Sequence, residues 1–404
     1  MLMNDDSGAI LILLAEYPVW SEAFLYRGIQ SLCSLDCRFR VAALRGLPSV
    51  NAPTASSTST VAAPAHPSVD ILTPAVASQA VGRSHPRLPR SLSTLGTRLR
   101  HRSALRPLLR HCEQHNVRHI HAEFCDLPAY LARAAAERLG ISHSVGAHAR
   151  DVFCCKYSLP KLLRDARFVT VCNSAAEHEL LRQGAVARDR LHLIHHGLPL
   201  SEWPFVEPPS SHGKIRFLWA GRMVPKKGLD LLLRSLARWA EQPGSRPRWQ
   251  LTMIGGGSEK PRLQALVRDL GIAEHITWRL PLPTAKLQQE FAEADALILP
   301  ARIADNGDRD GIPNVALEAM ATGLAVIATP TGGLPDIART DTAWIANSAN
   351  VEDLAEALDA FAHCAPQEAS ARRQRAREQV EDRFDLAVTT PTRQKLFNHY
   401  LQRS

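Results

Sequence analysis

A chain of 404 residues is long enough for about two domains of roughly 100 to 200 residues each, and a cleft between two domains is a natural place for a site. Hydrophobic residues make up 45% and charged residues 22% of the chain, which is typical of soluble globular proteins. No apolar run approaches the ~20 residues of a membrane-spanning helix, so the composition excludes a protein that crosses a bilayer.

The first predicted element is a buried strand at residues 10–15, and a second strand is predicted at 41–44. The first strand follows Asn4, Asp5 and Asp6 instead of a basic region and is too short for a signal peptide. We therefore expect the protein to stay in the cytoplasm.

Eight cysteines are present, and seven of them precede residue 173. They are Cys33, Cys37, Cys112, Cys125, Cys154, Cys155, Cys172 and Cys364. None belongs to a CxxC pair, and their spacing is not that of a zinc site. We expect buried free thiols and predict neither a disulfide framework nor a metal ion.

Residues 48–74 are rich in Ser, Thr, Ala and Pro, which predicts a flexible insertion, and an arginine-rich segment follows at 83–111. Its arginines are Arg83, Arg87, Arg90, Arg98, Arg100, Arg102, Arg106 and Arg110. Without these eight, the chain has 40 basic and 40 acidic residues, so the net charge of +8 is local. A local basic patch favours an anionic surface such as phospholipid headgroups or a lipid diphosphate, and a solvated basic loop is the alternative.

The next part of the chain alternates between strand and helix patterns. Apolar runs at 120–124, 142–145 and 168–172 flank a helical pattern at 128–139, as in parallel βα units. A break rich in Pro and Ser at 207–213 ends this first domain, which we predict to span 1–206.

The strand and helix pattern then restarts. Strands are predicted at 215–220, 250–254, 276–279, 296–299 and 325–329, with helices between them. Both halves thus read as doubly wound, Rossmann-like α/β sheets facing a cleft, with the second domain at 214–385 and a helix at 386–404 returning toward the first domain. In such sheets ligands bind at the carboxyl ends of the strands, and the polar motifs described next follow strand ends.

Cations follow the strand at 215–220, where the chain reads GRMVPKKG from residue 221. Arg222 offers a planar fork for phosphate oxygens, and Lys227 supplies a compact charge. Sugar transfer from a nucleotide leaves a diphosphate whose charge grows in the transition state, and fixed cations stabilise that growth. An exposed basic turn is the alternative interpretation.

Three glycines, Gly255, Gly256 and Gly257, join the following strand to a helix. Their backbone NH groups can approach a phosphate at the amino end of that helix. Glycine loops between strand and helix are also frequent without any ligand, so this motif alone is a weak indication.

Two acidic residues frame the start of the helix that follows the strand at 296–299. Asp310 precedes this helix, Glu318 lies about one turn inside it, and between them stand Gly311, Ile312, Pro313 and Asn314. Proline suits the first turn of a helix, and both carboxylates can face sugar hydroxyls at its amino end. Helix capping by Asp310 beside a surface Glu318 is the alternative.

Asp310 and Glu318 form a motif of an acid, seven residues and then Glu, which resembles the motif of the retaining GT-B glycosyltransferases of the glycogen-synthase-like (group 1) family. The resemblance to this family is strongest over about 215–345. The resemblance implies that Glu318 binds the nucleotide ribose and that Asp310, where the family more often has glutamate, meets the transferred sugar. It also implies that Arg222 and Lys227 hold the donor diphosphate.

Motifs in the first half are similar to those of colanic-acid and exopolysaccharide glycosyltransferases. They are YPVWSEAFL from Tyr17, HAEF from His121, GAHARDVF from Gly146 and HHGL from His195. The resemblance puts His148 beside the transferred sugar and makes His121 and Glu123 further candidates. Trp20, Ser21 and Glu22 stand where many relatives have a Gly-Gly loop, so they receive no role by analogy.

The resemblance implies a hexosyltransferase-type reaction that retains anomeric configuration without a metal ion or a cofactor, with a UDP- or GDP-sugar as the donor. The leaving phosphate would itself help to deprotonate the acceptor. Together with the arginine-rich segment, it implies a polyprenyl-diphosphate-linked or other saccharide acceptor, peripheral contact with the inner membrane face, and no nucleic-acid partner. A glycosidase with paired carboxylates, a nucleotide-sugar epimerase of related architecture and a basic nucleic-acid-binding protein are the alternatives.

Overall fold

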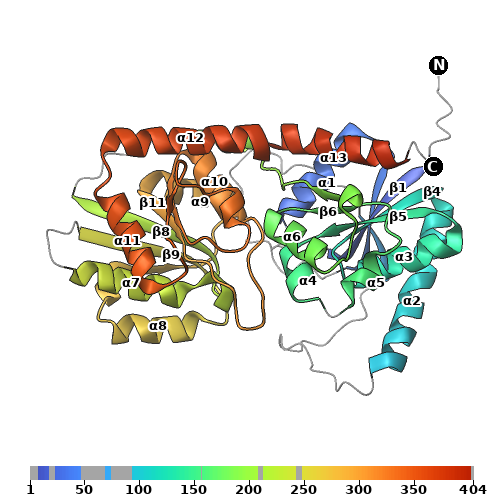
Figure 1. Cartoon of the computed structure of the whole chain (residues 1–404), viewed down its shortest axis with the longest axis horizontal. Coiled ribbons are helices and arrows are strands. Elements are labelled where there is room, and N and C mark those ends of the chain that lie inside the picture. Colours follow the sequence, from blue (N-terminus) through green and yellow to red (C-terminus); the bar gives the residue numbers. More distant parts are fainter. Residues whose placement is uncertain are drawn as a thin grey trace, which may run out of the picture. The chain divides into compact units, whose positions relative to one another are not determined.

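The computed structural model describes residues 8–17, 23–46, 69–73, 93–155, 157–207, 213–242 and 248–401. The described residues form two compact units (Figure 1). The first unit draws on Met1–Val171, Glu177–Ile194 and Thr390–Ser404, and the second on Cys172–Ala176 and His195–Thr389.

The first unit is built on a parallel sheet in the order β3-β2-β1-β4-β5-β6-β7. Its strands are β1 (Ala9–Tyr17), β2 (Phe39–Gly46), β3 (Val69–Thr73), β4 (Val117–Glu123), β5 (Ser142–Ala147), β6 (Val169–Val171) and β7 (Leu191–Leu193). Five successive residues of β1, from Ile10 to Leu14, are each no more than 2% exposed. Such burial on both faces explains why β1 is an unbroken apolar run, as is usual in parallel sheets.

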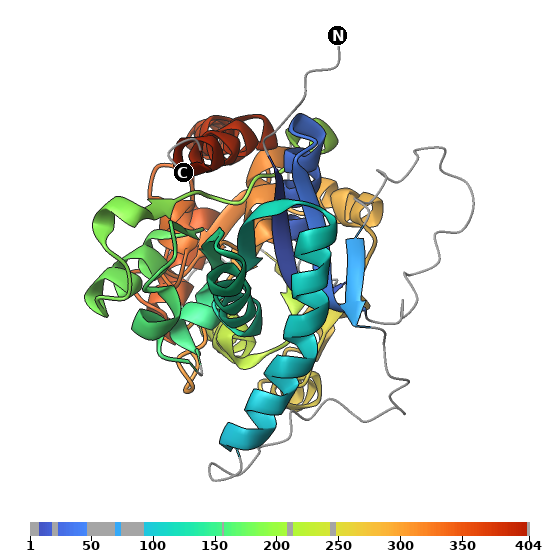
Figure 2. The same cartoon turned by 90° about the vertical axis from the view of Figure 1, so that its right-hand side faces the viewer.

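The helices of the first half follow the strands in βα order. They are α1 (Ala23–Leu35), α2 (Ser93–Gln114), α3 (Leu127–Leu139), α4 (Ala149–Phe153), α5 (Leu159–Leu163) and α6 (Ser174–Arg182), with the short 3₁₀ turn η2 (Arg188–Arg190). Figure 2 shows the long helix α2 beside β3, which it contacts together with β4. The core between α1 and the sheet also includes Phe397 from the end of the chain.

The second unit repeats the topology with its own parallel sheet, in the order β10-β9-β8-β11-β12-β13. Its strands are β8 (Lys214–Arg222), β9 (Arg248–Gly256), β10 (Ile276–Arg279), β11 (Ala296–Leu299), β12 (Ala325–Ala328) and β13 (Trp344–Ile345). Counted from the first strand of this sheet, the order is 3-2-1-4-5-6, the Rossmann order, so the strand order reverses between β8 and β11. Ligands of such sheets bind at the carboxyl ends of the strands beside this switch point.

Helices cover both faces of the second sheet (Figure 1). They are α7 (Leu229–Glu241), α8 (Lys260–Asp269), α9 (Thr284–Glu293), α10 (Asn314–Thr322), α11 (Val351–Ala362) and α12 (Pro366–Phe384), with the 3₁₀ turns η3 (Leu200–Glu202), η4 (Pro225–Lys227), η5 (Ala273–His275) and η6 (Leu334–Asp336). Helices α7, α8 and α11 pack on one face, and α9, α10 and α12 pack on the other. The last helix, α13 (Leu386–Leu401), crosses the division between the two units at Thr390.

The predicted strands and the doubly wound fold class are confirmed, whereas three short strands, β3, β7 and β13, were not predicted. The prediction of a flexible insertion at 48–74 is wrong at its end, because residues 69–73 pair with β2 in the sheet. Backbone hydrogen bonds to β2 order this segment, although it is too short to show a clear pattern. The rest of the insertion, Trp20, Ser21 and Glu22, and the arginines at 83, 87 and 90 lie outside the described residues.

The described cysteines are free thiols, as expected, but only Cys112, Cys125 and Cys172 are buried, whereas Cys37 is exposed and the other four are half-buried. Among the helices that the structure describes, none is long and apolar enough to cross a bilayer.

Candidate functional site

The carboxyl end of β8 lies at the switch point of the second sheet and ends with Arg222. The side chain of Arg222 is exposed, and within the described part of the chain it has no carboxylate partner. In the ladder between β8 and β9, Arg222 stands opposite Gly256. An exposed guanidinium group thus lies beside a glycine backbone, a combination suited to phosphate oxygens.

Two of the three predicted loop glycines have structural reasons to be glycine. A Cβ atom on Gly255 would lie 1.9 Å from the carbonyl oxygen of Gly221, and one on Gly257 would lie 2.3 Å from that of Met223. A Cβ atom on Gly256 would meet nothing within 4 Å. The loop therefore packs tightly at both ends, and Gly256 is the glycine that leaves space for a ligand.

Lys227 and Asp310 are brought together from opposite sides of the switch point. Nζ of Lys227 lies 2.6 Å from Oδ2 of Asp310, whose residue is only 7% exposed. Asp310 does not cap α10, because Pro313 occupies the N-cap position and no side-chain cap is formed. The alternative of helix capping by Asp310 is therefore excluded, and the carboxylate orients the lysine instead.

The start of α10 divides its residues between the core and the surface. Ile312 is 7% exposed and packs in the core with α9 and α12, and Pro313 is also buried. Gly311, Asn314 and Glu318 are half-buried, with Glu318 one turn inside the helix as predicted. Any contact of Ile312 with a ligand would therefore come from its backbone.

The first unit contains a buried polar network around Glu123, at the carboxyl end of β4. Nε2 of His148 lies 3.0 Å from Oε2 of Glu123, while Nε2 of His121 and a guanidinium nitrogen of Arg393 lie 3.6 and 3.8 Å from Oε1. Burial alone raises the pKa of the Glu123 carboxyl group, but hydrogen bonds from His121 and His148 and the charge of Arg393 outweigh it and hold that pKa well below its usual value. Glu123 is therefore an anion that only accepts, so Nε2 of His148 donates to it.

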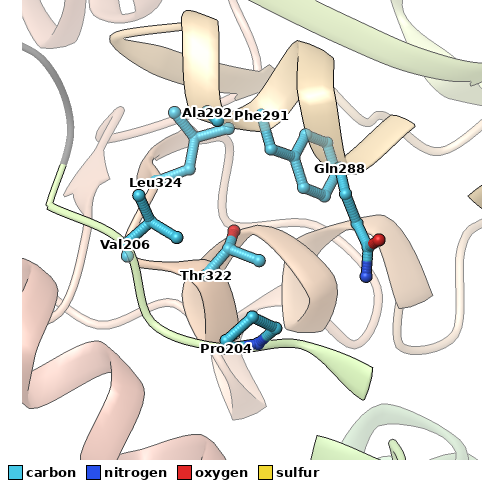
Figure 3. A pocket seen from close by; sticks show the side chains of 8 residues that line it. Pro204, Val206, Gln288, Phe291, Ala292, Thr322 and Leu324 are labelled. Carbon is cyan, nitrogen blue, oxygen red and sulfur yellow. The ribbon is translucent and has the colours of Figure 1, made fainter. Parts of the chain in front are cut away.

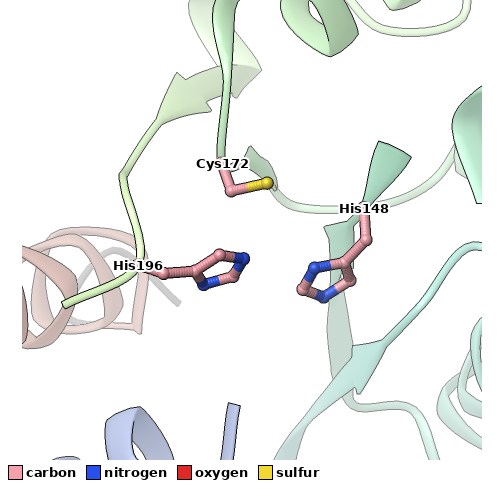
Figure 4. Close-up of side chains that lie close together, drawn as sticks. All are labelled: His148, Cys172 and His196. Carbon is pink, nitrogen blue, oxygen red and sulfur yellow. The ribbon is translucent and has the colours of Figure 1, made fainter. Parts of the chain in front are cut away.

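Two neighbours fix the ring of His148, which follows β5 and is drawn in Figure 4. The ring centroid of Phe124 lies 4.4 Å from it, and Phe124 has a φ of 80°, which is a strained value for a bulky residue. Gly146 leaves room for the carboxylate that bonds to this ring, because a Cβ atom on Gly146 would lie 2.4 Å from Oε2 of Glu123. Backbone strain beside a fixed histidine is a feature of functional sites.

Comparison with known families shows which family the second unit resembles. A model of the glycosyl transferases group 1 family matches residues 204–379. These residues form a group 1 glycosyl transferase domain. The domain includes Arg222, Lys227, the glycine loop, Asp310 and Glu318, whereas His148 and Glu123 lie outside it.

Curated relatives match parts of the chain. A GDP-mannose-dependent alpha-(1-6)-phosphatidylinositol monomannoside mannosyltransferase of Mycolicibacterium smegmatis is 37% identical over 116 residues, 28% of this chain and 30% of the relative. The amylovoran biosynthesis glycosyltransferase AmsK of Erwinia amylovora is 24% identical over 204 residues, 50% of this chain and 49% of the relative. The matches therefore span half or less of the length of these relatives.

Solved structures extend the likeness to the fold of the whole chain. The Anabaena protein HepE in complex with UDP-glucose gives a TM-score of 0.70 at 15% identity, covering 97% of this chain and 100% of that one. At this identity the likeness shows the fold alone, which is GT-B as predicted.

Within the group 1 domain, Lys226 was missed as a site residue. It is 8% exposed, and its Nζ lies 3.1 Å from Oδ1 of Asp308, 3.3 Å from the carbonyl oxygen of Arg309 and 3.6 Å from Oδ1 of Asp310. Its place next to Lys227 in the KK pair was the available signal. Lys226 holds the loop that presents Asp310.

Gly332 and Gly333 were also missed. A Cβ atom on Gly332, whose φ is 64°, would lie 2.2 Å from the carbonyl oxygen of Asp310, and the backbone N–H of Gly333 donates to that oxygen at 3.2 Å. The signal was a glycine pair shortly after the strand at 325–329. These glycines let the loop after β12 support Asp310.

An apolar pocket in the group 1 domain lies between α9, the end of α10 and residues 204–206 (Figure 3). It is lined by Pro204, Val206, Gln288, Phe291, Ala292, Thr322, Gly323 and Leu324. None of the predicted site residues lines it, so it plays no part in the site described above.

The HHGL motif belongs to the second unit and serves packing there. The ring of His195 packs against that of Phe384 in a tilted arrangement, and its Nδ1 bonds to the carbonyl oxygen of Cys172 at 2.9 Å. The side chain of His196 lies within 4.8 Å of that of Cys172 (Figure 4). The backbone of Leu198 then bonds to residues 384 and 386, which attaches the motif to the junction of α12 and α13.

Proposed function

We propose that this chain is a glycosyltransferase whose group 1 domain binds a nucleotide-diphosphate sugar, with the diphosphate on Arg222 and Lys227. The observation that carries the proposal is the exposed guanidinium group of Arg222 at the switch point, opposite the open backbone of Gly256. Cations and backbone NH groups held in place before the reaction stabilise the charge that grows on a leaving diphosphate. In mutagenesis, loss of one such group costs about 10²- to 10³-fold in kcat.

Asp310 has two tasks in this proposal. Its carboxylate holds the ammonium group of Lys227 at 2.6 Å, and it meets hydroxyls of the transferred sugar. Glu318, one turn inside α10, binds the nucleotide ribose. Both roles toward the ligand, like the place of His148 beside the sugar, come from the family resemblance.

The reaction that we propose retains anomeric configuration and needs no metal ion. The leaving phosphate deprotonates the acceptor on the face from which it departs, so no side chain acts as a covalent nucleophile. Fixed cations such as Arg222 supply the positive charge that this leaving group requires.

The donor is a UDP- or GDP-sugar. One relative is named for GDP-mannose, and HepE was solved with UDP-glucose, so the names of similar proteins include both bases. For the acceptor we propose a saccharide on a lipid diphosphate, in exopolysaccharide or cell-surface glycan synthesis at the cytoplasmic membrane face. Relatives named for amylovoran and for a phosphatidylinositol mannoside support an exopolysaccharide or lipid-linked acceptor, and the diphosphate is part of our proposal.

The test measures transfer of labelled sugar from radiolabelled UDP- and GDP-sugars to a lipid extract. EDTA is present throughout to test metal independence, and NMR of the product gives its anomeric configuration. We expect one donor to be used, with retained configuration. An epimerised donor without transfer would favour the epimerase, and hydrolysis of a glycan without a nucleotide donor would favour the glycosidase.

Two variants connect this activity to the site. Arg222→Ala should lower kcat by about 10²-fold with unchanged folding, because Arg222 is exposed. Lys214→Ala, at the opposite end of β8 and also exposed, is the matched control and should keep full activity. Unchanged turnover in folded Arg222→Ala would contradict the proposed diphosphate site.

A further inference from the structure

A second cluster of polar side chains lies in the first unit, where the end of α2 packs beside the edge strand β3 (Figure 2). Its members are Asp70 of β3, His111 in the last turn of α2, and His115 just after it. One ligand atom of each lies within 4.8 Å of those of the other two. None of these residues has a part in the proposed glycosyl transfer.

The local backbone puts the two histidines on one face. The N–H of His115 donates to the carbonyl oxygen of His111 at 3.1 Å, which continues the helical hydrogen bonding by one residue. Residues four apart in a helix are neighbours on its surface, and the two ring centroids are 4.5 Å apart. Asp70 comes from the sheet, where it pairs in register with Ala42 of β2.

His111 is the group that points to a ligand. Its residue is only 6% exposed, and its Nε2 atom has no hydrogen-bond partner among the residues that the structure describes. Oδ2 of Asp70 lies 3.9 Å from that nitrogen, which is too far for a hydrogen bond. A buried polar atom without a partner costs free energy, and a cation between the two atoms would satisfy both.

We propose that Asp70, His111 and His115 bind a divalent transition-metal ion, with Zn²⁺ as the best match. Two imidazoles and one carboxylate are a common ligand set for zinc, with water in the fourth position. Bonds of about 2.0–2.1 Å in a tetrahedron separate the ligand atoms by roughly 3.4 Å. Atoms that lie within 4.8 Å of one another therefore need to move closer by at most about 1.4 Å on metal binding. The carboxyl end of α2 adds a partial negative charge that favours a cation.

The ion would join the edge strand to the helix. Asp70 is on β3 and both histidines are at the end of α2, so a bound metal would link the two elements directly. Metal that binds the folded state alone raises Tm, by roughly 5 °C at a hundredfold excess over Kd for a unit of this size. Stabilisation, and not catalysis, is the expected effect.

The test uses the full chain without a histidine tag, freed of metal with EDTA and then desalted. Zn²⁺ alone is the probe, titrated in competition with a fluorescent indicator. Asp70→Asn and His115→Gln change an exposed and a half-buried residue, so both should fold, and each should weaken zinc binding by at least about tenfold. His363→Gln removes a histidine just after the end of α11 that also has a carboxylate four residues away, Asp359, and should change nothing.

X-ray absorption of the zinc-loaded protein gives a second measurement. We expect nitrogen and oxygen ligands at about 2.0 Å, with the imidazole signal reduced in His115→Gln. Sulfur ligands, an affinity unaffected in Asp70→Asn and His115→Gln, or an equal loss in His363→Gln would each overturn the proposal. All of these readouts are independent of glycosyl transfer, so a failed transferase assay does not affect them.

Discussion

At the scale of single residues, neighbouring lysines have different tasks. Among the residues that the structure describes, the ammonium group of Lys227 contacts Asp310 alone, whereas that of Lys226 contacts residues 308, 309 and 310 and is more buried. Lys227→Ala should therefore lower kcat by about 10²-fold with a small change in stability, since Lys226 still neutralises Asp310. Lys226→Ala should instead lower the free energy of unfolding by about 1 to 3 kcal/mol, because the half-buried carboxylate of Asp308 and the carbonyl oxygen of Arg309 lose this partner.

Steady-state kinetics and urea unfolding of the two lysine variants separate these effects. If Lys226→Ala lost activity without losing stability, and Lys227→Ala did the opposite, the assignment of the two lysines would have to be exchanged.

The Glu123 anion should stabilise the first unit at neutral pH. Its folded pKa lies well below the ordinary value of 4.5, so its contribution is present above pH 4.5 and is lost as the pH falls through the lowered pKa. Glu123→Gln should lower the free energy of unfolding at pH 7 by about 3 kcal/mol, because Arg393 loses its counter-ion and His148 loses a charged hydrogen-bond acceptor. Urea unfolding between pH 3 and 8 measures this, and the variant should be less sensitive to acid than the wild type.

Asp126 should behave in the opposite way. Burial, and then the nearby Asp151, raise its pKa from 3.8 to about 6, and its Oδ1 has no hydrogen-bond partner among the described residues. The protonated form is favoured in the folded state, so its contribution is complete below pH 3.8 and is lost as the pH rises through about 6. Asp126→Asn should raise the free energy of unfolding at pH 7.5 by about 1 to 3 kcal/mol, with no gain at pH 3.5. Thermal unfolding at both pH values checks this, and a gain that is equal at both would contradict it.

At the scale of elements, the glycine loop after β9 combines a structural and a binding task. Gly255→Ala should cost about 2 kcal/mol or more, because its φ of 139° and the Gly221 carbonyl oxygen leave no place for Cβ. Gly256→Ala should keep its stability, since a Cβ atom there meets no protein atom, but should lower kcat/KM by about tenfold by occupying the phosphate space.

The Gly256→Ala kinetics test the binding task, and the Gly255→Ala melting temperature tests the structural one. Full activity in Gly256→Ala would mean that no phosphate approaches this backbone.

Element patterns also show the limits of local information. Strands with long apolar runs, such as β1 and β8, were predicted because burial on both faces of a parallel sheet demands such runs. Strands β3 and β7 are interrupted by Asp70 and His192, and β13 has two residues, so none of them shows a continuous apolar run of strand length. Their place is decided by the neighbouring strand.

At the scale of the whole molecule, both units use the same order for their first six strands. In the second unit, this order puts the ends of β8 and β11 next to each other, so Lys227 meets Asp310 although 83 positions separate them. The arginine-rich segment adds the charge that motivates a membrane-bound acceptor, and Arg106 and Arg110 lie on α2.

The sequence by itself determined the βα alternation, the glycine loop and the helix start between Asp310 and Glu318. These features depend on the spacing of buried residues along the chain and on the backbone conformations that glycine and proline allow, which are set within a few residues. Only the tertiary structure decided that Asp310 pairs with Lys227 instead of capping a helix, that Glu123 is an anion beside His148, and that Asp70 reaches His111. Each of these pairs joins different strands or helices, and the crossover connections of parallel sheets bring such elements together at distances in sequence that no local pattern records.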